Sequence, residues 1–221
     1  MVNKYVNEFL ADDIIAVAEA AKENLTDGGI SPKKIKVILN GVEPLKKASQ
    51  KEIEDMKAKY HIAEGELVIG ILARVDAVKG HQYLIEAAEA LKKEGRAFKV
   101  LIAGTGENEQ ALKSLVKQKK LEDRVLFTGF LSDVKGFLSI LDIQVNASYG
   151  TEATSLALLE GMSMGLPAVV SNYGGNPGVI VHGENGYLFE SQSSEDLARY
   201  LKKEMSRKGL GRLAISLQKV E

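Results

Sequence analysis

The apolar residues of the chain fall into short continuous runs that alternate with longer segments of helical spacing. The runs are rich in β-branched residues and cover residues 34–39, 67–75, 98–104, 124–129, 142–148 and 167–171. Apolar side chains at consecutive positions are typical of strands that are covered on both faces. The segments between them predict helices over residues 81–95, roughly 107–120, 155–165 and 194–205. Strands that alternate with helices predict an α/β fold with a doubly wound, parallel, Rossmann-like sheet.

Helix boundary signals agree with this pattern. Apolar side chains recur every three or four residues from Leu84 to Leu91, and Gly95 then provides a stop. The polar residues 193–196 have the chemistry of a helix N-cap. In doubly wound sheets, ligands bind beyond the carboxyl ends of the strands. The residues that follow each apolar run are therefore the candidates for chemistry.

The two ends of the chain fit the alternation less well. Residues 1–33 predict a helix, a short strand near 13–17 and a second helix, which is too little for a domain. Residues 199–221 hold seven basic and two acidic side chains, with apolar residues at helical spacing from Leu210 to Val220. This tail predicts either an amphipathic helix that lies on a surface or a solvated, frayed terminus.

Charge and composition exclude several classes of protein. The chain has 29 basic and 30 acidic residues, so its formal net charge is −1, whereas dedicated nucleic-acid binders usually carry a basic excess. It has no cysteine, which excludes disulfides and thiolate zinc sites. The three histidines are scattered, so we expect no metal site. No apolar stretch approaches the roughly 20 residues of a membrane span.

Two cations follow the run 67–75. Arg74 ends this strand, and Lys79 comes just before the next helix. A guanidinium and an ammonium at one strand end form a suitable anion clamp, because both favour phosphate oxygens. Alternatively, Arg74 is a surface residue paired with a local carboxylate such as Asp76. Both interpretations remain open at the level of the sequence.

Two further strand ends carry weaker signals. Gly104 and Thr105 begin a partial glycine-rich loop, where a ligand or another backbone segment can come close. The complete GxGxxG fingerprint is missing, so a dinucleotide oxidoreductase is poorly supported. After the run 124–129, Phe130 and Leu131 could hold a nucleobase or could plug the core. The sequence alone favours the plug.

The segment from 149 to 167 contains the richest pattern. Thr154 or Ser155 can cap a helix whose free amides would face the ligand edge of the sheet and suit a phosphate. Glu152 stands just ahead of this helix. Glu160 is the only charged residue between Leu156 and Pro167. A carboxylate buried among Leu and Met needs a partner, which could be a sugar diol or a protein cation.

Five segments, taken in order, resemble a known family. They read ILNGVE, ILARVDAVKG, IAGTGE, FTGF and EATSLALLEGMSMGLPAVVSNYGG, at residues 38–43, 71–80, 102–107, 127–130 and 152–175. This series resembles the retaining GT-B glycosyltransferases of family 4 (group 1). The most specific feature is Glu152 and Glu160, separated by seven residues ahead of a Gly-Leu-Pro strand.

The resemblance implies two Rossmann-like domains that face a cleft. It identifies residues 34–205 as the second domain, which binds the nucleotide-sugar donor, and residues 1–33 as a remnant of the acceptor domain and linker. Residues 206–221 would form a helical tail. The rest of the acceptor domain is missing from this sequence, so the resemblance implies a fragment that is inactive alone. The full-length protein would take a carbohydrate or lipid-linked acceptor.

The resemblance also implies roles for individual residues. Arg74 and Lys79 would hold the donor diphosphate, and Glu152 would contact hydroxyls of the transferred sugar. Backbone amides of residues 154–156 (Thr154, Ser155 and Leu156) would meet phosphate. Glu160 would accept hydrogen bonds from the ribose diol.

The remaining implied contacts concern the base and the adjoining loop. The backbone of Phe130 and Leu131 would bracket the base, and Gly104 and Thr105 would lie beside the donor. The donor would be a nucleotide-diphosphate sugar of the UDP or GDP type, and its transfer would need no obligatory metal. The resemblance also implies a cytoplasmic location, with peripheral contact at the inner face of the membrane. Polysaccharide biosynthesis, lipid-linked glycan synthesis and small-glycoside synthesis all remain open as its pathway. The residues after Glu152 depart from the common Gly-Phe-Gly pattern, which leaves the identity of the sugar open.

Two alternatives remain. The first is a nucleotide-sugar epimerase of the same architecture, against which the Glu-x7-Glu spacing argues. The second is a non-catalytic nucleotide-binding domain, which the presence of both cations and both glutamates disfavours.

Overall fold

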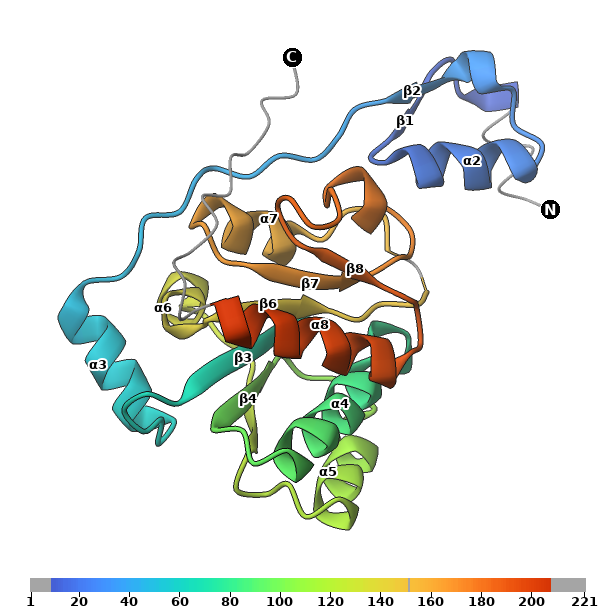
Figure 1. Cartoon of the computed structure of the whole chain (residues 1–221). Coiled ribbons are helices and arrows are strands. Elements are labelled where there is room, and N and C mark those ends of the chain that lie inside the picture. The colour runs from blue at the N-terminus through green and yellow to red at the C-terminus, as the bar shows by residue number, and fades with distance from the viewer. Residues whose placement is uncertain (1–8, 151, 208–221) are drawn as a thin grey trace.

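The computed structural model describes residues 9–150 and 152–207, and its largest feature is a six-stranded sheet (Figure 1). The strands are β3 (Leu67–Leu72), β4 (Phe98–Ala103), β5 (Val125–Gly129), β6 (Ile143–Asn146), β7 (Ala168–Ser171) and β8 (Tyr187–Phe189). All neighbouring strands pair in parallel, in the order β5-β4-β3-β6-β7-β8. The α/β fold class that the alternating pattern predicts is confirmed.

The strand order reverses direction at the centre of the sheet. From β3 the chain moves outward through β4 to β5, then returns to the other side of β3 and continues through β6, β7 and β8. β3 pairs with β4 through Leu67–Phe98 and with β6 through Ile69–Ile143. The crevice between β3 and β6 is therefore the topological switch point, where doubly wound folds bind ligands.

Helices cover both faces of this sheet (Figure 1). One face packs against α4 (His81–Lys93), α5 (Glu109–Gln118) and α8 (Ser194–Arg207). The other packs against α3 (Gln50–Lys59), α6 (Val134–Ile140) and α7 (Leu156–Ser163). Side chains alternate between the two cores, with Ile69 in the first and Val68 in the second. Strands buried on both faces explain the unbroken apolar runs of the sequence.

The N-terminal elements form a separate small unit. β1 (Ile14–Ala16) pairs in parallel with β2 (Ile35–Val37), and α2 (Glu19–Asp27) connects them, followed by the 3-10 turn Pro32–Lys34. The strand predicted near 13–17 is confirmed, whereas the run 34–39 pairs with it and does not join the main sheet. The domain boundary at residue 34 stays a prediction. Most of the predicted 206–221 tail lies outside the described residues.

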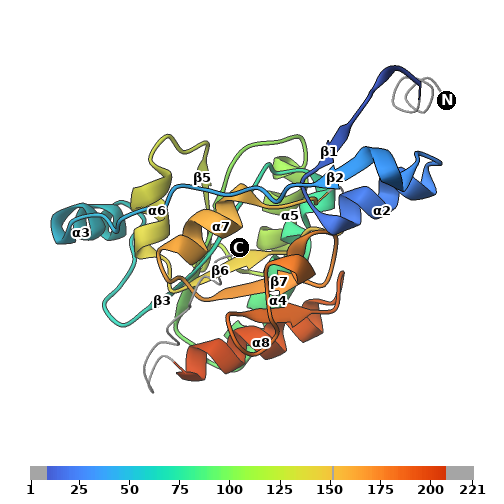
Figure 2. The same cartoon turned by 90° about the horizontal axis from the view of Figure 1, so that it is seen from above.

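An extended segment joins this unit to the main domain. Residues 38–49 have no regular secondary structure and run across α7 to α3, so that α2 and α3 lie at opposite ends of the molecule (Figure 2). The Leu45 amide donates to Ser163 Oγ at 3.0 Å, and the Ala48 amide donates to Ser139 Oγ at 2.9 Å. Ser49 then opens α3 with a capping box.

Candidate functional site

A polar cavity lies at the switch point. It has a volume of about 450 Å³ and is bounded by the ends of β3 and β6 and by the start of α7. Its polar lining consists of Arg74, Lys79, Gln144, Asn146, Ser148, Glu152, Thr154 and Ser155. We call it the switch-point cavity. Its size and mixture of groups suit a small polar ligand.

The structure brings together six of the predicted site residues. Arg74, Lys79, Glu152, Thr154, Ser155 and Leu156 all line the switch-point cavity, although they come from two separate segments, one after β3 and one between β6 and α7. The other predicted site residues are not among its lining residues, and they are Gly104, Thr105, Phe130, Leu131 and Glu160. Their predicted contacts with a donor stay predictions.

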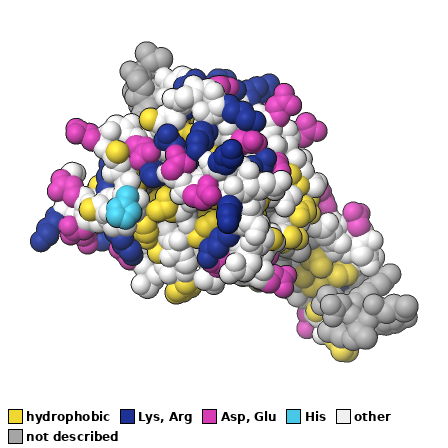
Figure 3. All heavy atoms as spheres, turned by 90° about the horizontal axis from the view of Figure 1, so that it is seen from below, with side chains coloured by type: hydrophobic (Ala, Val, Ile, Leu, Met, Phe, Trp, Pro, Cys, Tyr) yellow, Lys and Arg dark blue, Asp and Glu magenta, His cyan; other side chains and the backbone are white. Residues whose placement is uncertain are grey.

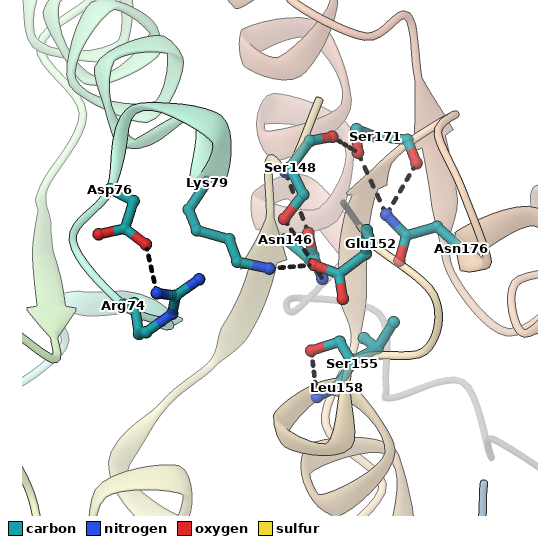
Figure 4. A network of polar contacts seen from close by, with 10 residues as sticks. All are labelled: Arg74, Asp76, Lys79, Asn146, Ser148, Glu152, Ser155, Leu158, Ser171 and Asn176. Carbon is teal, nitrogen blue, oxygen red and sulfur yellow. Dashed lines mark hydrogen bonds and ion pairs between the residues drawn. The ribbon is translucent and has the colours of Figure 1, made fainter. Parts of the chain in front are cut away.

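Lys79 and Glu152 form an ion pair inside the cavity. Lys79 Nζ lies 2.9 Å from Glu152 Oε2, and the two side chains are only 15% and 8% exposed. Lys79 ends the 3-10 turn Ala77–Lys79, and Gly80 follows it with φ at +68°. A Cβ at Gly80 would overlap the carbonyl oxygen of Ala147. This close approach brings the Lys79 turn against the segment that carries Glu152 (Figure 4).

Three donors converge on one oxygen of Glu152. Besides Lys79, Ser148 Oγ donates to Oε2 at 2.6 Å and Asn146 Nδ2 lies 3.5 Å from the same atom. Among the described residues, no protein group donates to Oε1. One carboxylate oxygen is therefore saturated by the protein, while the other is available to a ligand.

Arg74 stands at the mouth of the cavity. Its Nη1 lies 3.0 Å from Asp76 Oδ2, and its side chain is 74% exposed. It also borders a second, more open hollow of about 410 Å³ that Asp76 and Glu107 help to line. The pairing with Asp76 is therefore observed, and Arg74 also lines the switch-point cavity, while its role as an anion clamp stays a prediction.

The partial glycine-rich loop supports the backbone around Arg74. Gly104 has φ at +128°, and a Cβ there would overlap the carbonyl oxygen of Ala73. The Val75 amide donates to the carbonyl oxygen of Thr105 at 2.9 Å. The sequence allowed either a ligand or another backbone segment to approach this loop, and the structure shows a backbone segment, residues 73–75.

The start of α7 borders the cavity. Ser155 is the N-cap, since its Oγ accepts a hydrogen bond from the Leu158 amide at 3.3 Å. Thr154 instead donates from Oγ1 to the carbonyl oxygen of Val17 at 2.9 Å, which links the site to the N-terminal unit. Glu160 is half-buried on α7, and its carboxylate has no hydrogen bond or ion pair with any other described residue. An internal ion pair of Glu160 is therefore not observed.

The loop after β7 packs against the backbone of the segment that carries Glu152. The Gly175 amide donates to the carbonyl oxygen of Glu152 at 3.0 Å. A Cβ at Gly175 would overlap the carbonyl oxygen of Ala153, and one at Gly174 would overlap that of Glu152. The glycine-rich sequence of this loop is thus explained by backbone contact with the site.

The residues after β5 lie away from the switch-point cavity. Phe130 is 80% exposed, and Leu131 packs against the core beside α6. Leu131 thus matches the core-plug interpretation, whereas Phe130 presents its ring to solvent.

His81 is the first residue of α4 and is buried. Burial lowers the pKa of its imidazole to about 4, with a smaller downward effect of Lys79 and an opposing effect of Asp76. The side chain is therefore neutral at pH 7. This placement agrees with the expectation that His81 starts a helix.

Sequence reasoning missed Ser148 and Asn146. Both belong to the run 142–148, where Gln144, Asn146 and Ser148 interrupt the apolar residues at every second position. All three are at least 90% buried. Buried polar residues with a period of two point to one face of a strand, and this was the signal available.

Three further properties concern the residues that the structure describes. Within residues 9–150 and 152–207, no group of three His, Cys, Asp or Glu side chains could hold a metal ion. None of the helices in these ranges combines the length and apolar character needed to cross a bilayer. Basic and acidic side chains are interspersed over the face of the molecule shown in Figure 3.

A parallel sheet of this order with its flanking helices matches the Rossmann-like domains of GT-B proteins. The chain belongs to the family described as glycosyl transferases group 1, whose sequence model matches residues 52–213. It is 31% identical to N-acetyl-alpha-D-glucosaminyl L-malate synthase of Bacillus anthracis, over 80% of this chain and 46% of that protein. It is 30% identical to the amylovoran biosynthesis glycosyltransferase AmsK of Erwinia amylovora, over 85% of this chain and 46% of that protein.

Solved structures show the same fold. The Anabaena protein Alr3699/HepE in complex with UDP-glucose superposes with a TM-score of 0.88 at 26% identity, over 96% of this chain and 58% of that chain. The chain spans about half the length of the curated relatives it matches.

Proposed function

We propose that this chain supplies the donor-binding half of a retaining family 4 glycosyltransferase that uses a nucleotide-diphosphate sugar. The observation that carries the proposal is the convergence of Arg74, Lys79 and Glu152 on the switch-point cavity beside the capped start of α7. The solved complex of the Anabaena protein with UDP-glucose supports this choice of ligand.

The cations would bind the diphosphate. Lys79 lies within the cavity and Arg74 at its mouth, so a diphosphate between them would meet positive charge at two points. The amides at the start of α7 would add hydrogen bonds and the positive end of the helix dipole. Lys79 retains two N–H groups beyond the one that it donates to Glu152, so it can contact phosphate without breaking that ion pair.

The two glutamates would bind hydroxyl groups. Oε1 of Glu152 would accept a hydrogen bond from the transferred sugar, because the protein occupies only Oε2. Glu160 would accept from the ribose diol, since its half-buried carboxylate has no hydrogen bond or ion pair with another described residue.

The same residues would assist the reaction. As the bond between the sugar and the diphosphate breaks, negative charge develops on the departing phosphate and positive charge on the sugar. Arg74 and Lys79 would stabilise the first, and the Glu152 carboxylate would stabilise the second. The sugar would then reach the acceptor with retention at the anomeric carbon. No obligatory metal enters this proposal.

The biological setting is part of the proposal. We infer a UDP- or GDP-type donor and a carbohydrate or lipid-linked acceptor held by a further domain, and we expect this chain alone to transfer no sugar. The relative from Erwinia amylovora is named for amylovoran biosynthesis, which favours synthesis of a polysaccharide. We propose a cytoplasmic location, with peripheral contact at the inner face of the membrane.

Calorimetric titration of this chain with UDP, GDP and UDP-glucose tests the proposal. We expect at least one nucleotide to bind, and Arg74→Ala and Lys79→Ala each to weaken its affinity by about tenfold. Arg96→Ala is the matched control, because Arg96 lies just before β4, at the amino ends of the strands, whereas the cavity lies at their carboxyl ends. Absence of binding by every nucleotide at millimolar concentration would contradict the proposal.

A further inference from the structure

We infer that Ser148 is a positioning residue that fixes the carboxylate of Glu152 for the sugar part of the donor. The inference rests on the proposed function and adds to it a residue that neither the motifs nor the comparisons identify. It is carried by a chain of buried hydrogen bonds that ends on Glu152 (Figure 4).

The contact between Ser148 and Glu152 is the shortest of the three at Oε2. Ser148 Oγ lies 2.6 Å from Oε2, compared with 2.9 Å for Lys79 Nζ and 3.5 Å for Asn146 Nδ2. A hydroxyl has one proton, and an ionised carboxylate only accepts, so the proton of Ser148 is committed to Glu152. A charge-assisted hydrogen bond of this length fixes direction as well as distance.

A second layer fixes Ser148 itself. Ser171 Oγ donates to the Ser148 carbonyl oxygen at 2.6 Å, and Asn176 Nδ2 donates to Ser171 Oγ at 3.1 Å and to the Ser171 carbonyl oxygen at 3.0 Å. The Ser148 amide donates to Asn146 Oδ1 at 3.1 Å. Ser148, Ser171 and Asn176 are 2%, 0% and 1% exposed. Asn176 Oδ1 has no partner among the described residues, but the four buried hydrogen bonds restrict the backbone of Ser148 on both sides and so hold its hydroxyl in place.

Lys79 cannot provide this rigidity once a donor is bound. It is the longest of the three side chains, and its ammonium is the group that we assign to the diphosphate. An ammonium shared between phosphate and carboxylate is free to shift toward either, whereas Ser148 has only Glu152 to bind. In Figure 4 the second oxygen of Glu152 points away from all three donors. Ser148 therefore determines which oxygen is held by the protein and which meets the sugar.

The inference separates two parts of the affinity. Ser148 acts on the carboxylate that binds the sugar and not on the cations that bind the diphosphate. Removing its hydroxyl is thus expected to weaken the binding of a nucleotide sugar while leaving that of the free nucleoside diphosphate unchanged. A serine that merely stabilised the fold would affect both ligands equally.

The test measures the dissociation constants of UDP and UDP-glucose, or of GDP and GDP-glucose if only GDP binds, for three single variants. Ser148→Ala removes the hydroxyl that donates the hydrogen bond to Glu152. Ser148→Cys replaces it with a weaker hydrogen-bond donor while keeping the volume of the side chain filled. Ser139→Ala is the control, because the hydroxyl of this partly buried serine also donates a hydrogen bond, to the Lys135 carbonyl oxygen at 2.7 Å, but lies on α6, away from the cavity. We expect both Ser148 variants to weaken nucleotide-sugar binding by about five- to tenfold, with the affinity for the diphosphate within twofold of wild type.

A double-mutant cycle shows whether Ser148 acts through Glu152. In a Glu152→Gln background, Ser148→Ala is expected to change nucleotide-sugar affinity by less than twofold, since the carboxylate that it positions is gone. An equal effect in both backgrounds would overturn the inference, as would a parallel loss of both ligands in Ser148→Cys or unchanged binding in both Ser148 variants. If the wild-type chain binds neither UDP nor GDP, the proposed function itself fails.

Discussion

Each cation of the site has an acidic partner close by. Arg74 pairs with Asp76 at 3.0 Å, and Lys79 pairs with Glu152 at 2.9 Å. Each cation is therefore already paired with a carboxylate. An anion that enters the cavity must share Arg74 with Asp76 and Lys79 with Glu152. The two pairs differ in burial, because the Arg74 side chain is 74% exposed and that of Lys79 only 15%. Water screens the outer pair, whereas burial strengthens the electrostatic interaction of the inner pair.

The outer pair gives a prediction at this scale. Asp76→Asn removes the competing charge from Arg74 and should tighten the binding of UDP or GDP by about threefold, a modest gain because the pair is exposed. Titration calorimetry measures the change. Asp123→Asn is the control, since Asp123 forms a comparable pair with Lys92 far from the cavity. Weaker binding by Asp76→Asn would show that Asp76 orients Arg74 for the phosphate and does not compete with it.

At the scale of elements, the loops after the strands shape the site by packing against one another. The loop after β4 contacts the backbone of residues 73–75, and the loop after β7 contacts the backbone of Glu152 and Ala153. In both cases glycines permit the approach, because a side chain would collide with a carbonyl group. The position of Glu152 thus depends on residues more than twenty positions later in the chain.

Two glycines of one loop form a matched pair for a test of this packing. Gly175→Ala places a methyl group against the Ala153 carbonyl group and should destabilise the protein by about 2 kcal/mol. The added methyl group of Gly178→Ala meets open space, so this variant should change the free energy of unfolding by less than about 0.5 kcal/mol. Chemical denaturation of both variants gives the comparison. Equal stability of the two would contradict the close contact. We also expect Gly175→Ala alone to weaken nucleotide-sugar binding, because the Glu152 segment must shift.

The sequence predicts the central elements well because their patterns are local. The strands from β3 to β7 and the helices α4, α5, α7 and α8 follow from apolar runs and helical spacing. Residue chemistry narrows the N-cap of α7 to Thr154 or Ser155, and the structure shows Ser155. The three-residue strand β8, the seven-residue helix α6 and helix α3 were not predicted, since the first two are too short for a pattern and the third buries no residue fully. The pairing of β2 with β1 is a long-range choice that apolar content does not encode.

The candidate site could be predicted only in part for a similar reason. Strand ends place Arg74, Lys79 and Glu152 at one edge of any parallel sheet, and the switch point brings β3 beside β6. Whether a glycine admits a ligand or a backbone depends on three-dimensional packing, and the sequence left this question open for Gly104. The period-two placement of Ser148 indicates only the strand face on which it lies, whereas its role depends on a contact with Glu152, four positions later, that the pattern does not encode.

For the whole molecule, a buried histidine couples stability to pH. Unfolded His81 has a pKa near 6.5, while burial lowers that of the folded state to about 4. Between these values the unfolded chain binds a proton that the folded chain does not, so stability is complete above pH 6.5 and falls toward pH 4. The lowered pKa values of Glu52, Glu89 and Asp123 act below about pH 4.5, so the upper part of the window isolates the histidine.

Unfolding free energies of wild type and His81→Leu between pH 7.5 and 4.5 test this coupling. We expect wild type to lose up to about 3 kcal/mol through His81, and the variant to lose that much less over the same range, whatever its stability at pH 7. Identical slopes for the two proteins would mean that His81 is not held neutral by burial.

The central claim is that the switch-point cavity binds a nucleoside diphosphate between Arg74 and Lys79. A crystal structure of this chain soaked with UDP-glucose and, separately, with a GDP-linked sugar tests it most directly. The account predicts density for one diphosphate beside the start of α7, with the attached sugar within hydrogen-bond distance of Glu152 Oε1. Nucleotide bound elsewhere on the protein, or an empty cavity at saturating ligand concentration, would contradict it.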